Sequence, residues 1–469
     1  MTGRYIIGII FLLAITFFQA CSSLKEAKQT DYSYPTGIPR LMEPSAMPSG
    51  DPEAGFDYLI YGGHVGNGVP YKLNQRFFGE IEDTVLRREG KNGQVPFFTN
   101  VFTNEDGIEV VSGNCFVCHA TELNGKIVLG LGNSFGNYTR NDSWKFRLLN
   151  TMVRLSYGKN SAEWKSYEEQ GKWYNAIGKP IVMNNPGTNP AFRLEEATIA
   201  YRHRTDLSYK ADPNFMLAGP SMGTDVPPLW NVHKKHGLYY SGAGRGDFTK
   251  LLMQVTLLGV PDSSVARTVQ QHFYDVFAWM RTIEPPAYPK PINHSLAQKG
   301  QLLFADHCAK CHGTYGERET YPNKIIPMAE IGTDSVYAAY SIRSELTAWY
   351  NDSWLSQSSP QAKLVPAYGY IAPPLDGIWA SSPYLHNGSV PTIADLLDSQ
   401  HRPTYWARSG KSDDYDYQKL GWKYQVRKHK RGKYTFDTTQ HGAANHGHTF
   451  GDDFRQEERL AVIEYLKTL

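Results

Sequence analysis

The sequence has almost no excess of charge of either sign. Its 469 residues contain 48 Lys and Arg against 46 Asp and Glu, which leaves a formal net charge of +2. Domains that bind nucleic acids by electrostatic attraction carry a marked basic excess. The composition therefore argues against that class, and we expect no nucleic-acid partner.

The N-terminus lacks a hydrophobic run of membrane-spanning length. Arg4 precedes an uncharged apolar run from Tyr5 to Phe18, whereas a spanning helix needs about 20 apolar residues. A run this short is typical of the central region of a signal peptide. We therefore expect residues 1–20 to be a signal peptide and the protein to be exported.

Small Ala20 stands directly before Cys21, which two serines follow. This arrangement resembles the lipobox of bacterial lipoproteins, in which the cysteine becomes the lipid-carrying N-terminus after cleavage. The resemblance implies lipidation at Cys21 and a lipid-anchored protein of the periplasm or cell surface, with the anchor as its only membrane attachment. The alternative is a simple signal peptide with an incidental cysteine.

Cysteine is scarce, and its placement is informative. Apart from Cys21, the chain has two Cys-x-x-Cys pairs, each followed at once by histidine: Cys115, Cys118 and His119, then Cys308, Cys311 and His312. This is the attachment sequence of c-type haem. Two thiols on one helical turn reach the vinyl groups of one porphyrin, and the next residue places an imidazole beneath the iron.

Three other uses of such pairs explain less. The pairs lie much further apart than the cysteine pairs of zinc ribbons or fingers. Disulfides would be allowed in an exported protein but leave the histidines unexplained, and a thioredoxin-type pair is not expected twice with histidine following. Because no mature cysteine remains for another purpose, we predict two haem c groups as cofactors.

The remaining sequence is typical of helices joined by long loops, with no convincing run of strands. We expect a tether over 21–52, an N-terminal haem domain over 53–284 and a C-terminal cytochrome c domain over 285–469, beginning with a stiff proline-rich connection at 285–291. The predicted fold class is mainly α, with two cytochrome c-like domains. Helices are predicted over Ser143–Ser156, Ser161–Ile177, Phe192–His203, Ser263–Ile283, Ser295–His307 and Gln456–Leu469.

Two of these predicted helices suit a known arrangement. In cytochromes c, a first and a last helix cross at the haem edge, where a small glycine allows close approach. Gly300, shortly before Cys308, and the terminal helix Gln456–Leu469 fit that pair. The alternative is two ordinary amphipathic helices.

The ligand on the second face of each iron decides between electron transfer and reaction with small molecules. After His119 the next methionine is Met152, inside a predicted helix, and the next histidine is His203. The first haem is therefore expected to have an available face, unless His64, His203, His233 or His236 folds back. Candidates at the second haem are Met328, His386, His401, His441, His446 and His448.

Two longer segments carry a family resemblance. The segment 372–379, Ala-Pro-Pro-Leu-Asp-Gly-Ile-Trp, and the segment 382–392, Ser-Pro-Tyr-Leu-His-Asn-Gly-Ser-Val-Pro-Thr, resemble the dihaem cytochrome c peroxidase superfamily. Pro-Pro-Leu-Trp at 227–230, Lys-Lys at 234–235 and Gly-Arg-Gly-Asp-Phe at 244–248 are most similar to its rubber-oxygenase-like branch. The resemblance extends from about Tyr58 to the C-terminus.

The resemblance implies a reactive haem at His119, with Trp230 and one of Tyr239, Tyr240 or Phe248 near its open face. It implies an electron-relay haem at His312, with His448 as the opposite ligand. For His386 it implies a propionate or supporting contact, and a buried loop-fixing histidine is the alternative.

These expectations define a haem-dependent oxidoreductase. The first haem is expected to bind peroxide or dioxygen, and the second to exchange electrons with a small cytochrome or another external donor or acceptor. Peroxide reduction requires an acid or base beside the iron, and His233, His236 and Tyr240 are candidates for it. Oxygenation of an apolar substrate requires instead a dry aromatic pocket, which Trp230 and its neighbours suggest. The alternative is a pure electron-transfer dihaem cytochrome.

Overall fold

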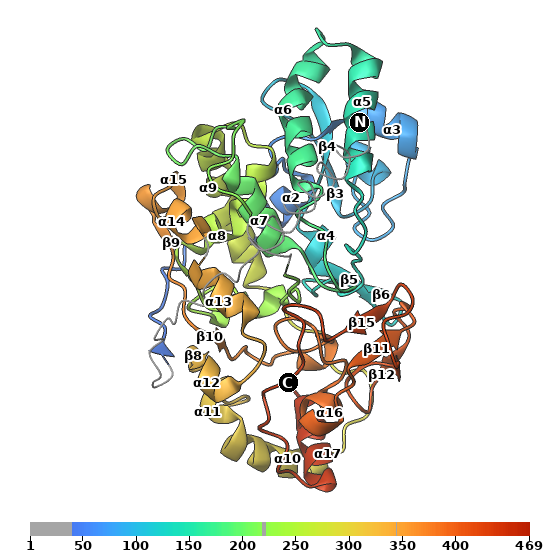
Figure 1. Cartoon of the computed structure of the whole chain (residues 1–469), viewed down its shortest axis with the longest axis vertical. Coiled ribbons are helices and arrows are strands. Elements are labelled where there is room, and N and C mark those ends of the chain that lie inside the picture. The colour runs from blue at the N-terminus through green and yellow to red at the C-terminus, as the bar shows by residue number, and fades with distance from the viewer. Residues whose placement is uncertain (1–39, 218–221, 344) are drawn as a thin grey trace, which may run out of the picture. The chain divides into compact units, whose positions relative to one another are not determined.

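The structure is a computed structural model that describes residues 40–217, 222–343 and 345–469 (Figure 1). The chain divides into Met1–Gly37 and Ile38–Leu469, and only the second unit is described below. The expected signal peptide and Cys21 lie outside the described residues. Within those residues, no helix combines the length and apolarity that a bilayer crossing requires.

The long helices predicted for the N-terminal half are present. They are α5 (Ser143–Tyr157), α6 (Ala162–Ile177), α7 (Ala191–Ala200) and α9 (Ser263–Met280). The side chain of Asp262 accepts hydrogen bonds from the backbone of Ser264 and Val265, which satisfies free N–H groups at the start of α9. These helices are therefore confirmed, with ends within three residues of the expected ones.

Short strands accompany the helices, so that helices hold 39% and strands 14% of the chain. The strands that frame the first haem motif are β2 (Val69–Pro70), β3 (Thr99–Thr103), β4 (Glu109–Gly113), β5 (Ala120–Leu123) and β6 (Lys126–Leu129). Val101 pairs with Val111 in the sheet β2-β4-β3. None of these strands exceeds five residues, too short for a clear alternating pattern in the sequence.

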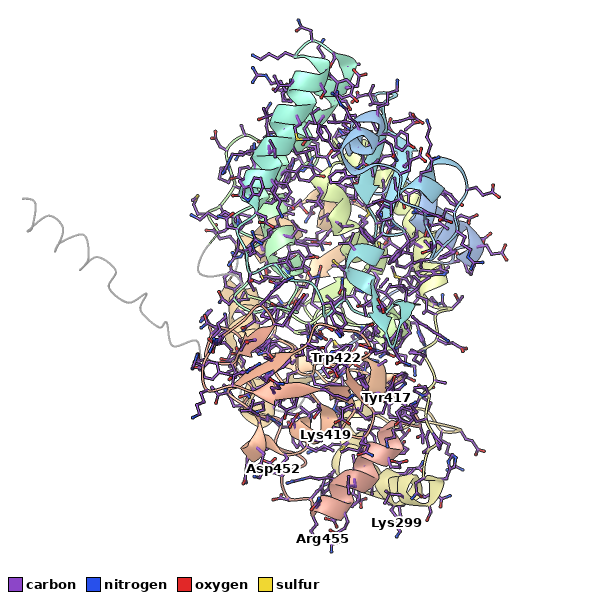
Figure 2. The ribbon with its side chains drawn as sticks, turned by 90° about the vertical axis from the view of Figure 1, so that its right-hand side faces the viewer. Lys299, Tyr417, Lys419, Trp422, Asp452 and Arg455 are labelled. Atoms are coloured by element: carbon purple, nitrogen blue, oxygen red, sulfur yellow. The ribbon has the colours of Figure 1, made fainter. Side chains whose placement is uncertain are left out.

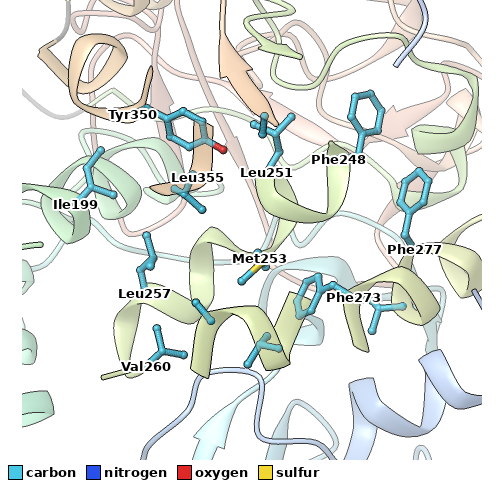
Figure 3. Close-up of a cluster of buried hydrophobic side chains, with 14 of the residues drawn as sticks. Ile199, Phe248, Leu251, Met253, Leu257, Val260, Phe273, Phe277, Tyr350 and Leu355 are labelled. Atoms are coloured by element: carbon cyan, nitrogen blue, oxygen red, sulfur yellow. The ribbon is translucent and has the colours of Figure 1, made fainter. Parts of the chain in front are cut away.

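The first hydrophobic core draws on both halves of the chain (Figure 3). Around α9 it gathers α8 (Phe248–Leu252), α14 (Glu345–Asn351) and α15 (Trp354–Gln357), with Phe273, Tyr350 and Leu355 buried together. Beside it, β7 (Gly244–Gly246) pairs with β9 (Ala362–Leu364). Residues 345–364 thus pack with the N-terminal half, although the expected boundary lies at 284/285.

The second core is built on α10 (His294–His307) and α17 (Gln456–Leu466). A Cβ added at Gly300 would lie 1.9 Å from the carbonyl oxygen of Ala461, so only glycine permits this approach. Figure 2 shows the two helices side by side, with Lys299 on one and Arg455 at the start of the other. The predicted crossing of these helices is confirmed.

The start of the described chain is more ordered than a tether. β1 (Arg40–Leu41) pairs with β8 (Lys324–Pro327), and the side chain of Met42 is buried. Asp51 then caps α2 (Pro52–Tyr61), which packs against α9. Within the expected tether over 21–52, residues 40–42 are therefore held on the protein by backbone pairing and by burial of Met42. Residues 43–51 form no helix or strand, and most of them are exposed.

The other elements are short. They are α3 (Tyr71–Phe78), α4 (Phe116–His119), α11 (Ala309–His312), α12 (Met328–Ile331), α13 (Val336–Arg343), α16 (Ile393–Leu396), β10 (Gly369–Ile371), β11 (Tyr405–Arg408), β12 (Tyr415–Asp416), β13 (Gly421–Trp422), β14 (Tyr424–Val426) and β15 (Thr435–Asp437), with 3-10 turns between them.

Candidate functional site

The first Cys-x-x-Cys-His motif forms a single helical turn, α4, between β4 and β5. The backbone N–H of His119 donates to the carbonyl of Cys115 at 2.9 Å. The hairpin β5-β6 reverses at Asn124 and Gly125, both with positive φ, as two-residue hairpin turns require. It returns Gly130, whose N–H donates to the carbonyl of His119 at 2.8 Å and fixes the orientation of the turn.

The second motif repeats this geometry on a different support. The helix α10 leads directly into the turn α11, where the N–H of His312 donates to the carbonyl of Cys308 at 3.0 Å. The imidazole Nδ1 of His312 lies 2.8 Å from the carbonyl oxygen of Pro373. That bond leaves Nε2 of His312 for a metal, the arrangement by which metal-binding histidines are usually oriented.

A proline carbonyl also interacts with the first histidine. Burial lowers the pKa of His119 to about 4, and the carbonyl of Pro227 acts in the opposite direction. The residues that supply these carbonyls stand in the same short sequence, Pro-Pro-Leu, at 227–229 and at 373–375. The repeat is visible in the sequence and places a proline carbonyl near each histidine. The two supports differ, because Nδ1 of His119 has no hydrogen-bond partner among the described residues.

Both motifs line one largely apolar cavity of about 620 Å³. All six motif residues reach it, from Cys115, Cys118 and His119 to Cys308, Cys311 and His312, as does the predicted ligand His448. The four thiols form no disulfide. Burial raises the pKa of Cys115 and of Cys308 to about 12.

His448 lies opposite His312, with ring centres 6.3 Å apart. Because an imidazole nitrogen sits about 2 Å from a transition-metal ion, two imidazoles on opposite sides of one ion have ring centres roughly 6 Å apart. Burial lowers the pKa of His448 to about 3, which keeps the ring in the neutral form that binds metals. The pair therefore has the spacing and protonation state of two axial ligands.

Backbone contacts hold His448 in place. Its N–H donates to the carbonyl of Ile331 at 2.7 Å, at a positive φ of 45°. The guanidinium of Arg402 donates to the carbonyls of Asn445, Gly447 and His448. This ordering is consistent with a ligand role, because axial ligands need fixed orientations.

No comparable imidazole faces His119 within residues 40–217, 222–343 and 345–469. His64, His203, His233 and His236 do not line the cavity; His64 is buried near Tyr58, and Nδ1 of His236 lies 2.9 Å from the carbonyl oxygen of Met42. Met280, in the last turn of α9, does line it. The thioether of Met280 is thus a possible iron ligand that the sequence reasoning missed.

A half-buried acid, Glu195 on α7, also lines the cavity. Burial raises its pKa to about 8, and a hydrogen bond with Tyr239 acts in the opposite direction. The hydroxyl of Tyr239 also accepts a hydrogen bond from Nε2 of Gln254 at 2.7 Å. Glu195 can therefore hold or release a proton near neutral pH; in the sequence it is one of two consecutive glutamates in a helix and carries no distinctive signal.

The structure separates the three residues expected to be catalytic. Tyr240 lines the cavity, with its hydroxyl 3.4 Å from a carboxylate oxygen of Asp225. Trp230 is buried outside the lining, and its indole donates to the carbonyl of Asp376 at 2.8 Å. Phe248, the first residue of α8, is fully buried in the first core, where its ring contacts Phe277. It therefore does not line the cavity.

His386 lies in the cavity wall rather than opposite a motif histidine. Its ring stacks on Tyr370 with centres 4.1 Å apart, and burial lowers its pKa to about 4. Its Nε2 has no hydrogen-bond partner among the described residues. This position suits a contact with the edge of a bound group, as the resemblance implied.

The residues present thus fit a covalently bound haem at each motif. In each, two thiols and an imidazole share one turn at a common apolar cavity, and a proline carbonyl acts on the imidazole. Zinc is not supported by the donor geometry, since no three ligand-type side chains converge anywhere in the described part of the chain.

Comparison with known proteins gives one family match. The family described as RoxA-like, cytochrome c-like matches residues 369–407, which include the segments at 372–379 and 382–392 discussed above. The match supports a cytochrome-type haem protein, haem c as its cofactor and, at this coarse level, a haem oxidoreductase.

The other similarities are partial. Two curated proteins of Sinorhizobium fredii, the uncharacterized proteins y4iM and y4iJ, are each 30% identical to this chain, over 42% and 40% of its length. The matched regions cover 49% and 41% of those proteins. Among solved structures, Kuenenia stuttgartiensis hydrazine synthase, pressurised with xenon, aligns over 59% of this chain and 86% of the hydrazine synthase chain. The sequence identity is 14% and the TM-score is 0.25.

Proposed function

We propose that this chain is an exported dihaem c-type oxidoreductase in which the two haems have different tasks. The His119 haem reacts with peroxide or dioxygen, and the haem between His312 and His448 exchanges electrons with an external partner such as a small cytochrome. The proposal depends on a difference between His119 and His312 in what lies opposite each imidazole. His448 faces His312 at 6.3 Å, whereas the described residues place no imidazole opposite His119.

The residues that would hold the cofactors are those of the two motifs. Cys115, Cys118, Cys308 and Cys311 would form the thioether bonds, and His119, His312 and His448 would bind iron. When bound, haem supplies the redox chemistry and, where one axial position is open, the binding of peroxide or dioxygen.

The chain's own contribution is a proton site in the apolar cavity that both motifs line, and we assign it to the first haem because His448 already faces His312. The Glu195 carboxyl has a pKa near neutrality and can accept a proton from an incoming hydroperoxide or return it to a leaving oxygen. Tyr239 and Gln254 orient it through their hydrogen bonds. The proton site favours peroxide over an apolar oxygenase substrate. Of the aromatic residues expected beside such a substrate, Tyr239 and Tyr240 line the cavity, whereas Trp230 and Phe248 do not.

A second candidate function is pure electron transfer, and Met280 favours it. A methionine bound to the first iron would close the face at which peroxide binds. Carbon monoxide binding to the reduced protein distinguishes the two, because carbon monoxide requires an open position.

The proposal predicts one high-spin ferric signal, one low-spin signal, and one equivalent of carbon monoxide bound per chain. Two low-spin haems that bind no carbon monoxide would overturn it in favour of the electron carrier. Turnover of hydrogen peroxide with a reduced small cytochrome, against consumption of dioxygen with polyisoprene, then decides between the peroxidase and the oxygenase.

A further inference from the structure

The helix α5 exposes an apolar stripe. Trp144, Leu148 and Leu155 are 50%, 49% and 80% exposed. Their spacing of four and seven residues places them on one side of a helix. The opposite side, with Leu149 and Val153, is packed into the protein. The helix therefore has two apolar sides, of which one is left at the surface.

Basic residues flank this stripe. Arg147 and Arg154 lie along one edge and Lys145 along the other, as the helical period dictates, and α5 contains no Asp or Glu. Lys145 pairs with Asp142 at 2.6 Å, with both side chains well exposed, so the pair is weak. The two arginines have no ion-pair partner within the described residues.

The neighbouring helix α3 has the same character. Figure 1 shows α3 beside α5. Leu73 of α3 is buried in the same cluster as Val153 of α5. The helix α3 exposes Phe77 and Phe78, at 49% and 67%, and it carries Lys72 and Arg76 without any acidic residue.

We propose that α5 and the adjoining α3 form a membrane-surface site that binds a bilayer containing anionic phospholipid. Helices that lie in a bilayer interface combine Trp, Phe and Leu on one side with flanking Lys and Arg, which is the arrangement seen here. The two helices carry five basic residues and no acidic one. Lys145 pairs with Asp142, and the unpaired Arg147 and Arg154 match an anionic lipid surface. A second copy of this chain would instead bring two cationic faces together.

The test is hydrogen–deuterium exchange of the full-length, haem-loaded protein with two kinds of vesicle. One contains phosphatidylglycerol in phosphatidylcholine and the other phosphatidylcholine alone. The N-terminal segment can attach to either kind of vesicle, so exchange is measured at the two helices themselves. We expect the backbone amides of residues 71–78 and 143–157 to become protected only with the anionic vesicles. Salt at about 0.5 M removes the protection, because it screens the attraction.

Variants assign the effect to the stripe and to its cations. Leu148→Ser with Leu155→Ser abolishes the protection, whereas Leu302→Ser, at a 71% exposed leucine on α10, leaves it unchanged. Arg147→Gln with Arg154→Gln raises the lipid concentration for half-maximal protection about 25-fold, since each basic residue near an anionic surface contributes about fivefold. All of these side chains are exposed, so the fold is retained.

Three results would overturn the proposal. Equal protection on both vesicles, or none on either, excludes an anionic bilayer as the occupant. Protection that grows with protein concentration without vesicles assigns the face to a second copy. Protection on adding an acidic cytochrome, but not vesicles, assigns it to a protein partner.

Discussion

At the scale of single residues, the two motif histidines have the same covalent setting and different surroundings. His312 has an imidazole across from it, held by Arg402 and the backbone of Ile331, whereas no imidazole faces His119 among the described residues. Glu195 lines the cavity that both motifs share. The choice between a closed and an open iron therefore depends on a few side chains distant in sequence from each motif.

His448→Ala removes the group opposite His312. We expect the second haem to change from low-spin to high-spin while the first is unchanged, because no other imidazole faces His312 in the described structure. Electron paramagnetic resonance of the ferric protein measures both signals separately. The control is His446→Ala, at an exposed histidine two residues away; an unaltered low-spin signal in His448→Ala would remove His448 as a ligand.

Glu195→Gln tests the proton site. If the carboxylate accepts the proton of hydrogen peroxide, only its ionised form is active, so the rate rises as pH increases through the folded pKa of about 8. Glutamine cannot ionise, so the rise disappears and the rate falls by about 10²- to 10⁴-fold. Stopped-flow mixing with peroxide across this pH range measures both effects. The control is Glu168→Gln, at an exposed glutamate that does not line the cavity. The same rise in Glu195→Gln would assign it to another group.

At the scale of elements, the crossing of α10 and α17 places the second motif at the cavity. Gly300→Ala would put a methyl group 1.9 Å from the carbonyl oxygen of Ala461, so the helices must move apart. We expect a loss of about 1–3 kcal/mol in the free energy of unfolding, as for other overpacked sites. Urea denaturation followed by circular dichroism measures it. Gln301→Ala, exposed on the same helix, should change stability by less than about 0.5 kcal/mol, and an equally small effect at Gly300 would show that the contact is loose.

The elements also show why sequence reasoning succeeded in some places and failed in others. The helix α9 was predictable because Asp262 caps it and Pro285 and Pro286 follow it, and the α10–α17 pair because Gly300 precedes a haem motif. These signals are local. The short strands beside α4 are stabilised by pairing between distant segments, and the functional position of Glu195 depends on tertiary burial, so neither leaves a local pattern.

At the scale of the whole molecule, the two halves share one core. Trp349, Tyr350 and Leu355 are buried with α9, so a chain ending at residue 284 lacks part of its interior. Each such side chain contributes about 1.5–3 kcal/mol, and the sum approaches the total stability of a domain, about 5–15 kcal/mol. We expect residues 1–284 alone to show no cooperative thermal unfolding, and co-expression with residues 285–469 to restore it. A cooperative transition in the isolated fragment, measured by calorimetry, would show that the halves fold independently.

The shared cavity has a consequence for how such a protein is made. Its walls come from both halves of the chain, and both haem motifs face inward. A porphyrin attached at these cysteines would lie between segments from both halves of the chain. On the proposed function, we therefore expect haem attachment to precede the final packing of the cavity-lining segments 224–240 and 370–397.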